Sequence, residues 1–194
     1  MRLVQFTRQD VVAMVGLGII PEDASTELLN GVIVIKDRAA RGEDPFMVGK
    51  DHYKCVERFS NLRNKINSAG RFVQSQQPLV CSDIHVPEPD FAVIRGRLED
   101  LQDLPNSSDT FCVVEVADSS YERDAGAKLV SYARAGIQQY IIINLRNRTA
   151  EVYTQPDIAA GSYPPPVIIS ESGKLLLRVG ESDVFEVALS ELLP

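Results

Sequence analysis

Three charged residues, Asp90, Glu115 and Lys128, stand in stretches of sequence that otherwise favour burial. Glu115 interrupts the run FCVVEVA, whose other members all suit a buried strand. A carboxylate in such surroundings costs free energy unless it is protonated, paired or bound to a metal ion. Asp90 follows the proline-rich turn PEP and precedes the apolar run FAVI, so we expect it at the start of a second strand.

If those two strands are adjacent, the carboxylates of Asp90 and Glu115 can reach one point at the edge of a sheet. Two carboxylates at close range repel, which raises the pKa of at least one of them unless a cation lies between them. Oxygen ligands with room for water suit Mg²⁺ or Mn²⁺ rather than zinc. We therefore expect Asp90 and Glu115 to be the metal ligands.

Lys128 supplies the third element. On a helix it lies four residues after Asp124, so the two side chains can pair across one turn, and it can also point toward the strand end that carries Glu115. An ammonium beside metal-bound carboxylates can position or help deprotonate a water, and can stabilise a pentavalent phosphate. Asp90, Glu115 and Lys128 together predict a metal-dependent phosphodiesterase site.

Each of these residues also has a purely structural interpretation. Asp90 after a proline is a common turn former. Glu115 can be a charge on an edge strand that faces solvent, and Lys128 with Asp124 can be a solvated helix pair. The order of the three residues favours the site.

Four further residues are candidates to support it. Glu27 can be a further metal ligand or can hold the ligands from an N-terminal hairpin, and an exposed strand glutamate is the alternative. His52 begins a helix and can face the site or remain a surface residue. Gln76 precedes the Asp90 turn and can touch metal-bound water, while Asp124 can pair with Lys128.

The pattern of apolar residues predicts an α/β protein. Asn30-Gly31 between two apolar runs favours a β-hairpin, because both turn positions tolerate positive φ. Helices are predicted over 7–15, 50–69 and 120–135, strands over 71–76, 78–82, 91–95, 111–117, 138–145 and 148–155, and a polar loop over 38–46. The stretch from 111 to 145 resembles a βαβ crossover with parallel strands.

Composition limits the class of protein. The 194 residues are 44% hydrophobic, which suffices for one domain over 1–194 with a substantial core. A formal net charge of −7 argues against a protein that coats nucleic acid or membrane by bulk attraction, without excluding a local basic groove. Three widely spaced cysteines support neither a zinc ribbon nor a disulfide framework, and no signal core or membrane-spanning run is present. We expect a cytoplasmic protein.

The order Pro89-Asp90, Glu115 and then a lysine resembles the PD-(D/E)xK nuclease superfamily. The chain as a whole resembles more closely the Uma-type restriction endonuclease family, also called domain of unknown function 820, over about residues 7–193. The residues that carry this resemblance are Glu27 with Asn30-Gly31, His52, Pro89-Asp90, Glu115-Val116 with Ser119, Asp124 with Lys128, and Tyr132-Gly136-Ile137-Tyr140.

The chain departs from these patterns at three positions. The lysine that the superfamily usually carries two residues after the glutamate would fall at Ala117, which cannot serve. In the resembling family the lysine lies on the following helix, and Lys128 fits that shift. Ile141 and Asn144 stand where family members often have Trp and Asp, and Asn144 removes a carboxylate from the neighbourhood.

The resemblance implies a restriction-endonuclease-like fold, with a mixed β-sheet flanked by helices and an N-terminal β-hairpin. It also implies an endonuclease that hydrolyses DNA with Mg²⁺ or Mn²⁺, acting as a homodimer. The acidic net charge leaves a second hypothesis open: a non-catalytic nucleic-acid- or protein-binding module that retains the nuclease fold. A third is a metal-dependent hydrolase of small phosphoesters.

Overall fold

A six-stranded mixed β-sheet forms the centre of the molecule, in a computed structural model that describes residues 4–35 and 49–194. The polar loop predicted over 38–46 lies outside the described residues. In spatial order the strands are β3 (Arg71–Ser75), β4 (Phe91–Arg95), β5 (Thr110–Ala117), β6 (Gln139–Asn144), β7 (Thr149–Thr154) and β8 (Val167–Ser170). The predicted α/β class with a mixed sheet is confirmed.

The predicted βαβ crossover is present at the middle of this sheet. Strands β5 and β6 pair in parallel, with Val114 opposite Ile141, whereas the other neighbours in the sheet pair antiparallel. The crossover runs through α4 (Tyr121–Arg123), the π-helical segment η4 (Asp124–Lys128) and α5 (Leu129–Arg134). Strand β4 lies directly beside β5, as the predicted meeting of Asp90 and Glu115 requires.

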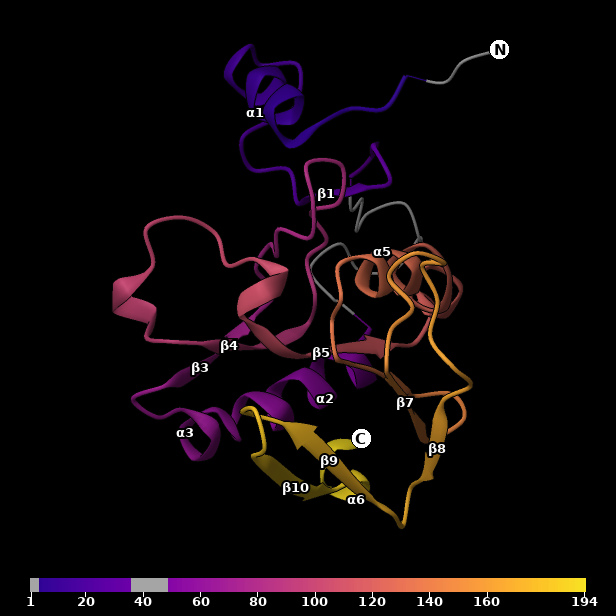
Figure 1. The fold of residues 1–194 in the computed structure, drawn as a ribbon. Helices are drawn as coiled ribbons and strands as arrows, with labels where there is room; N and C mark the ends of the chain where they lie inside the picture. Colours follow the sequence, from indigo (N-terminus) through magenta and orange to yellow (C-terminus); the bar gives the residue numbers. More distant parts are fainter. Residues whose placement is uncertain (1–3, 36–48) are drawn as a thin grey trace.

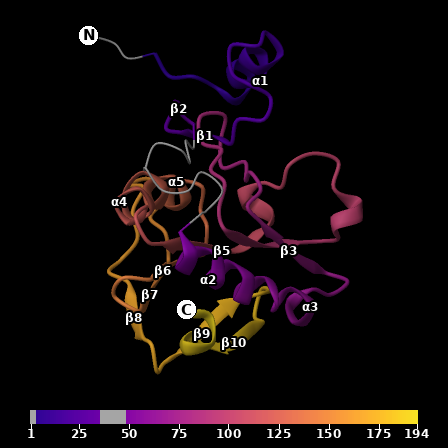
Figure 2. The ribbon, with the colours of Figure 1, turned by 180° about the vertical axis from the view of Figure 1, so that it is seen from behind.

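Helices cover both faces of the sheet. The crossover helices lie on one face, and α2 (Lys50–Ser60) and α3 (Arg63–Ile66) lie on the other (Figure 1). Beyond α2 is a small layer of β9 (Lys174–Arg178), β10 (Val184–Ala188) and α6 (Leu189–Leu192), seen from behind in Figure 2. Two apolar cores result, because alternate β5 side chains point to opposite faces: Val114 toward α2, and Val113 toward α5.

The N-terminal hairpin is also confirmed. Strands β1 (Thr26–Leu29) and β2 (Val32–Ile35) pair antiparallel around Asn30 and Gly31, whose φ angles are +53° and +73°. The hairpin docks on the segment before β4, where the amide of Leu28 donates to the carbonyl of Val86 and the amide of Val86 donates back. This docking brings β1 next to the turn that precedes Asp90. Before the hairpin, α1 (Arg8–Gly16) begins with a capping box at Thr7 and buries none of its residues.

Some sequence predictions were wrong at the level of elements. The helix predicted over 50–69 breaks after Ser60 into α2 and α3, and it ends early because the Asn67 side chain accepts a hydrogen bond from the Val73 amide. The strand predicted over 78–82 is absent, since the amides of Leu79 and Val80 bond to proline carbonyls outside any strand. Within the described ranges no helix is long and apolar enough to cross a membrane.

Candidate active site

Asp90 lies immediately before β4, at the end where this strand meets the last residues of β5. Its Oδ2 accepts a hydrogen bond of 2.8 Å from the backbone amide of Val116, which fixes the carboxylate beside β5. Burial alone would raise the pKa of Asp90. The contact with His52 and the Val116 amide outweigh that effect, so the pKa lies below its ordinary value. Asp90 is therefore held as a partly buried anion.

Glu115 is buried in β5, with 3% of its surface exposed, and it points toward α5 rather than toward solvent. Its Oε1 accepts from the Lys128 ammonium at 2.9 Å and from the Tyr132 hydroxyl at 2.8 Å. Both hydrogen bonds are accepted by Oε1, and Oε2 takes part in neither of them. Burial raises the pKa of Glu115 to about 8, against the opposing charge of Lys128. The interpretation of Glu115 as a solvent-facing edge charge is wrong.

Lys128 is the cation at the centre of the site, and it is 1% exposed. An ammonium has three N–H donors. Here three acceptors face it: Glu27 Oε1 at 2.8 Å, Glu115 Oε1 at 2.9 Å and the Glu88 carbonyl at 3.2 Å. Burial alone would lower the pKa of Lys128, but the neighbouring carboxylates raise it above its ordinary value. Lys128 is thus a protonated and fully bonded group, not a solvated helix residue.

The backbone of the crossover helix places this lysine. At its start Ser120 makes no side-chain cap bond and instead donates to Asp124 Oδ2 at 2.5 Å. Asp124 is the first and Lys128 the last residue of a π-helical segment, a conformation that often marks functional sites. Burial raises the pKa of Asp124, whose carboxylate accepts a hydrogen bond from Ser120 rather than from Lys128.

Glu27 joins the site from the N-terminal hairpin, as the sequence allowed. It is completely buried, so the alternative of an exposed strand glutamate is wrong. Besides pairing with Lys128, its Oε1 accepts the backbone amide of Glu88 at 2.8 Å. A single oxygen therefore connects β1, the turn before β4 and the crossover helix.

His52 and Gln76 lie on the other side of Asp90. His52 Nε2 is 3.2 Å from Asp90 Oδ2, and because an ionised carboxylate only accepts, Nε2 carries a proton in this contact. Among the described residues its buried Nδ1 has no hydrogen-bond partner. Gln76, in the positive-φ region at +49°, directs its amide to Asp90 Oδ1 at the long distance of 3.4 Å. Both residues are in contact with Asp90.

The charge balance of the site fits a divalent cation. Four carboxylates, those of Glu27, Asp90, Glu115 and Asp124, act on one another and on the ammonium of Lys128, and the Arg123 guanidinium lies 3.7 Å from Asp124. Mg²⁺ is commonly bound by one or two carboxylates with several waters, and Asp90 and Glu115 are the residues that would provide such a donor set. In the described parts of the chain, no group of three or more His, Cys, Asp or Glu is arranged to hold a metal ion. Water or substrate oxygens would complete the coordination.

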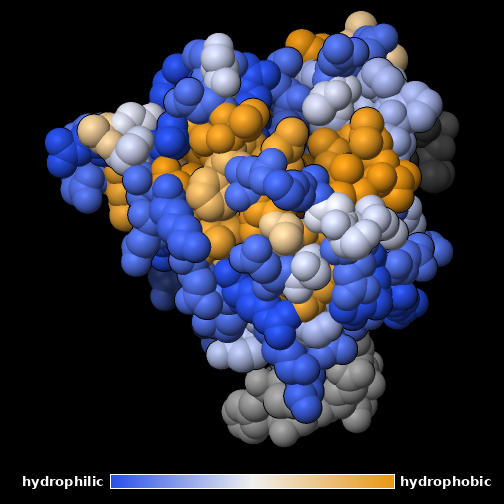
Figure 3. Space-filling view, turned by 90° about the horizontal axis from the view of Figure 1, so that it is seen from below, coloured by the Kyte–Doolittle hydropathy of each residue, from blue (hydrophilic) through white to orange (hydrophobic). Residues whose placement is uncertain are grey.

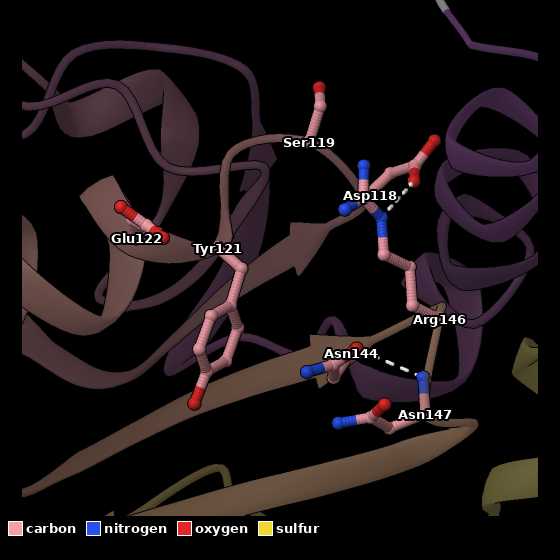
Figure 4. A pocket seen from close by; sticks show the side chains of 7 residues that line it. All are labelled: Asp118, Ser119, Tyr121, Glu122, Asn144, Arg146 and Asn147. Atoms are coloured by element: carbon pink, nitrogen blue, oxygen red, sulfur yellow. Dashed lines mark hydrogen bonds and ion pairs between the residues drawn. The ribbon is translucent and has the colours of Figure 1, made fainter.

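Sequence analysis missed two features of the site. The first is the Tyr132 hydroxyl on Glu115, although the spacing of Tyr132 correctly marked it as buried. The second is a pocket of about 410 Å³ at the carboxyl ends of β5 and β6 (Figure 4). Its lining residues are Asp118, Ser119, Tyr121, Glu122, Asn144, Arg146 and Asn147. Asn144, which stands where family members often have Asp, lies in this pocket and was the one indication of it in the sequence. The pattern of apolar residues in strands does not by itself reveal a pocket.

The fold is that of a nuclease-like α/β protein. The chain is similar to the crystal structure of a "putative nuclease belonging to DUF820" from Anabaena variabilis, with a TM-score of 0.66 and 14% sequence identity. The similarity covers 96% of this chain and 97% of that one, and at such low identity it shows the fold. A family model described as "Putative restriction endonuclease" matches residues 14–181, and the chain therefore belongs to the Uma2 family. A search of curated proteins gave no significant match.

The substitution Lys128→Met should destabilise the protein by roughly 3–5 kcal/mol, because it leaves buried carboxylates without their cation. The double variant Lys128→Met with Glu27→Gln should recover part of that loss, since one of the stranded charges is removed. Urea unfolding of the wild type, both single variants and the double variant measures the coupling. Additive losses would contradict the direct ion pair.

The metal-free protein should lose stability as the pH rises. Unfolded Glu115 ionises near its ordinary pKa of 4.5, whereas folded Glu115 keeps its proton until about 8, so its contribution is complete below pH 4.5 and lost through pH 8. The slope should be on the order of 1 kcal/mol per pH unit in this window. Thermal unfolding in EDTA measures it, and Glu115→Gln should flatten the profile. An unchanged profile in that variant would assign the slope to other groups.

Proposed function

We propose that the chain is a Mg²⁺- or Mn²⁺-dependent endonuclease that hydrolyses DNA phosphodiester bonds. The observation that carries the proposal is that Asp90 is bonded to the Val116 amide, directly after Glu115 on the neighbouring strand, while the Lys128 ammonium is bonded to Glu115. Membership of the Uma2 family and the nuclease-like fold support a nuclease. Nearby carboxylates in excess of cations are typical of sites for divalent metals.

Asp90 and Glu115 would hold the metal ion, which would act as a Lewis acid on the phosphate and lower the pKa of a bound water. Asp90 is suited to this because its pKa is depressed and the Val116 amide fixes its orientation. Glu115 is suited because Lys128 and Tyr132 engage Oε1 and leave Oε2 for a ligand. Gln76 lies where it can donate to a water bound at Asp90.

Lys128 contributes its charge. A lysine with a raised pKa is a poor general base, and its three donors already have acceptors. Of the roles expected for this residue, the geometry favours electrostatic stabilisation of the transition state over direct contact with the attacking water. In a site of low dielectric constant this effect does not require contact.

A specific observation favours a second candidate, a non-catalytic nucleic-acid- or protein-binding module. Within residues 4–35 and 49–194 the carboxylates do not form a ready three-ligand metal group. The net charge of −7 also gives DNA no general electrostatic attraction. Calorimetry with Mn²⁺ separates the two functions, since absence of binding at millimolar metal selects the module.

Cleavage of covalently closed circular DNA tests the nuclease, because an endonuclease needs no free end. The wild type should nick the circle in Mg²⁺ or Mn²⁺ and not in EDTA. Asp90→Asn should lower the rate by about 100-fold or more, as expected when a metal ligand is weakened. The exposed Asp23, changed to Asn, is the matched control and should cut like the wild type. Equal rates of nicking in the wild type and in both variants would contradict the proposed nuclease.

We also propose a homodimer. Strand β8 ends the sheet, and its Val167 and Ile168 are 62% and 56% exposed. Figure 3 views the molecule from the side of β9, β10 and α6, where apolar areas lie between polar ones. Such exposed apolar surface favours association.

The mass in solution at micromolar concentration should correspond to two chains by sedimentation. Ile168→Lys should shift it toward one chain, because a charge on an edge strand opposes pairing. The exposed Ile158, changed to Lys, is the matched control and should leave the mass unchanged. A wild-type mass of one chain would contradict the homodimer.

A further inference from the structure

The pocket at the carboxyl ends of β5 and β6 lies at the same end of the central sheet as Asp90. Asp118, on its wall, follows Glu115 by three residues and directly continues β5. Gly49, which begins the helix of His52, lies so close that a Cβ there would be 3.4 Å from Asp118 Oδ2. A ligand in this pocket would occupy the same end of the sheet as a phosphodiester held near Asp90. Carboxyl ends of parallel strands are a common place for ligands in α/β proteins.

The floor of the pocket offers hydrogen-bond donors. Asn144 is 5% exposed, and its Oδ1 accepts the backbone amide of Asn147 at 3.1 Å. This bond fixes the orientation of the amide, so Nδ2 is turned away from the turn and toward the pocket, as is the side-chain nitrogen of Asn147 (Figure 4). A ligand with acceptor atoms on one edge can meet both groups.

An aromatic ring forms the opposite wall. The Tyr121 side chain lies beside Asn144 and Asn147, and its ring lines the pocket (Figure 4). Burial, and then the neighbouring carboxylate of Glu151, raise the pKa of its hydroxyl, so the ring presents a neutral phenol. Planar heterocycles stack on such rings with little regard to sequence.

The charges of the pocket disfavour a phosphate. Two carboxylates, Asp118 and Glu122, face one guanidinium, and Arg146 already pairs with Asp118 at 3.2 Å. The surplus of negative charge repels an anion. A neutral, planar part of a nucleotide is compatible with it.

We propose that this pocket receives one unpaired base of the nucleic acid, stacked on Tyr121 and hydrogen-bonded to the amides of Asn144 and Asn147. The inference rests on the proposed function, because the active site beside the pocket defines the ligand as DNA. It deepens that function: the substrate is single-stranded, or has a base turned out of the duplex, next to the bond that is cut.

Binding of short oligonucleotides in EDTA tests the pocket without any cleavage. The probes are fluorescent pentadeoxyadenylate and a pentamer of abasic sites with the same phosphates, measured by anisotropy. The wild type should bind the adenine pentamer about 10-fold more tightly, because a base stacks on an aromatic ring and an abasic site cannot. The ratio of the two affinities should fall to about one in Tyr121→Leu and in Asn144→Asp. The second variant keeps the acceptor for the Asn147 amide and loses the donor.

The matched control is Asn61→Asp, the same change at an exposed position after α2, which should keep the ratio of the wild type. A second readout needs no variant: the Asn144 side-chain amide should shift in nuclear magnetic resonance spectra with the adenine pentamer and not with the abasic one. A wild-type ratio near one, a ratio retained in either pocket variant or an unmoved amide overturns the inference. If circular DNA is not cut but the ratio holds, the nuclease fails and the base pocket remains.

Discussion

The buried ammonium of Lys128 is the contact on which the rest of the site depends. It bonds to Glu27 on the hairpin, to the Glu88 carbonyl in the turn before β4 and to Glu115 on β5. Segments separated by up to 101 residues, from Glu27 to Lys128, therefore meet at one charge. An unpaired charge in such a place would be prohibitive, so these segments can pack only when the cation and the carboxylates are brought together.

The same cluster is the physical basis for the metal ion that we propose at this site. The Lys128 ammonium and the Arg123 guanidinium beside Asp124 are fewer than the four neighbouring carboxylates. The consequence is visible in the pKa of Glu115, raised to about 8 by burial and by its acidic neighbours. The pKa of Asp90 is lowered instead, because the His52 contact and the Val116 amide stabilise its anion. The site thus contains one carboxylate prepared to bind a cation and one that a cation would help to ionise.

Ala117 shows why the lysine comes from a helix in this chain. Its side chain is completely buried in the core that contains Tyr132 and Tyr140, on the same face of β5 as Glu115. A lysine there would have to enter packed aromatic rings. The lysine comes instead from the π-helical segment that packs on this face of the sheet, where Lys128 bonds to Glu115. One turn later, the Tyr132 hydroxyl donates to the same Glu115 oxygen.

Much of this protein follows from local patterns in its sequence. Asn30-Gly31 specifies the hairpin, the apolar runs around Glu115 and Ile141 specify a buried parallel pair, and the cost of a buried carboxylate marks Glu115 as unusual. These are properties of neighbouring residues, so a sequence can carry them. The single-domain organisation and the roles of Asp90, Glu115 and Lys128 stay predictions.

Only the tertiary structure decided which charges meet. The sequence allowed Lys128 to pair with Asp124 or to point toward Glu115, and the fold selects Glu115 and adds Glu27, because the π-helical turn and the docked hairpin are set by long-range packing. The side-chain bond that orients the Asn144 amide, and the hollow beside it, likewise depend on how two strand ends and a turn come together. The sequence determined which residues would be costly to bury, and the packing of distant segments determined what satisfies them.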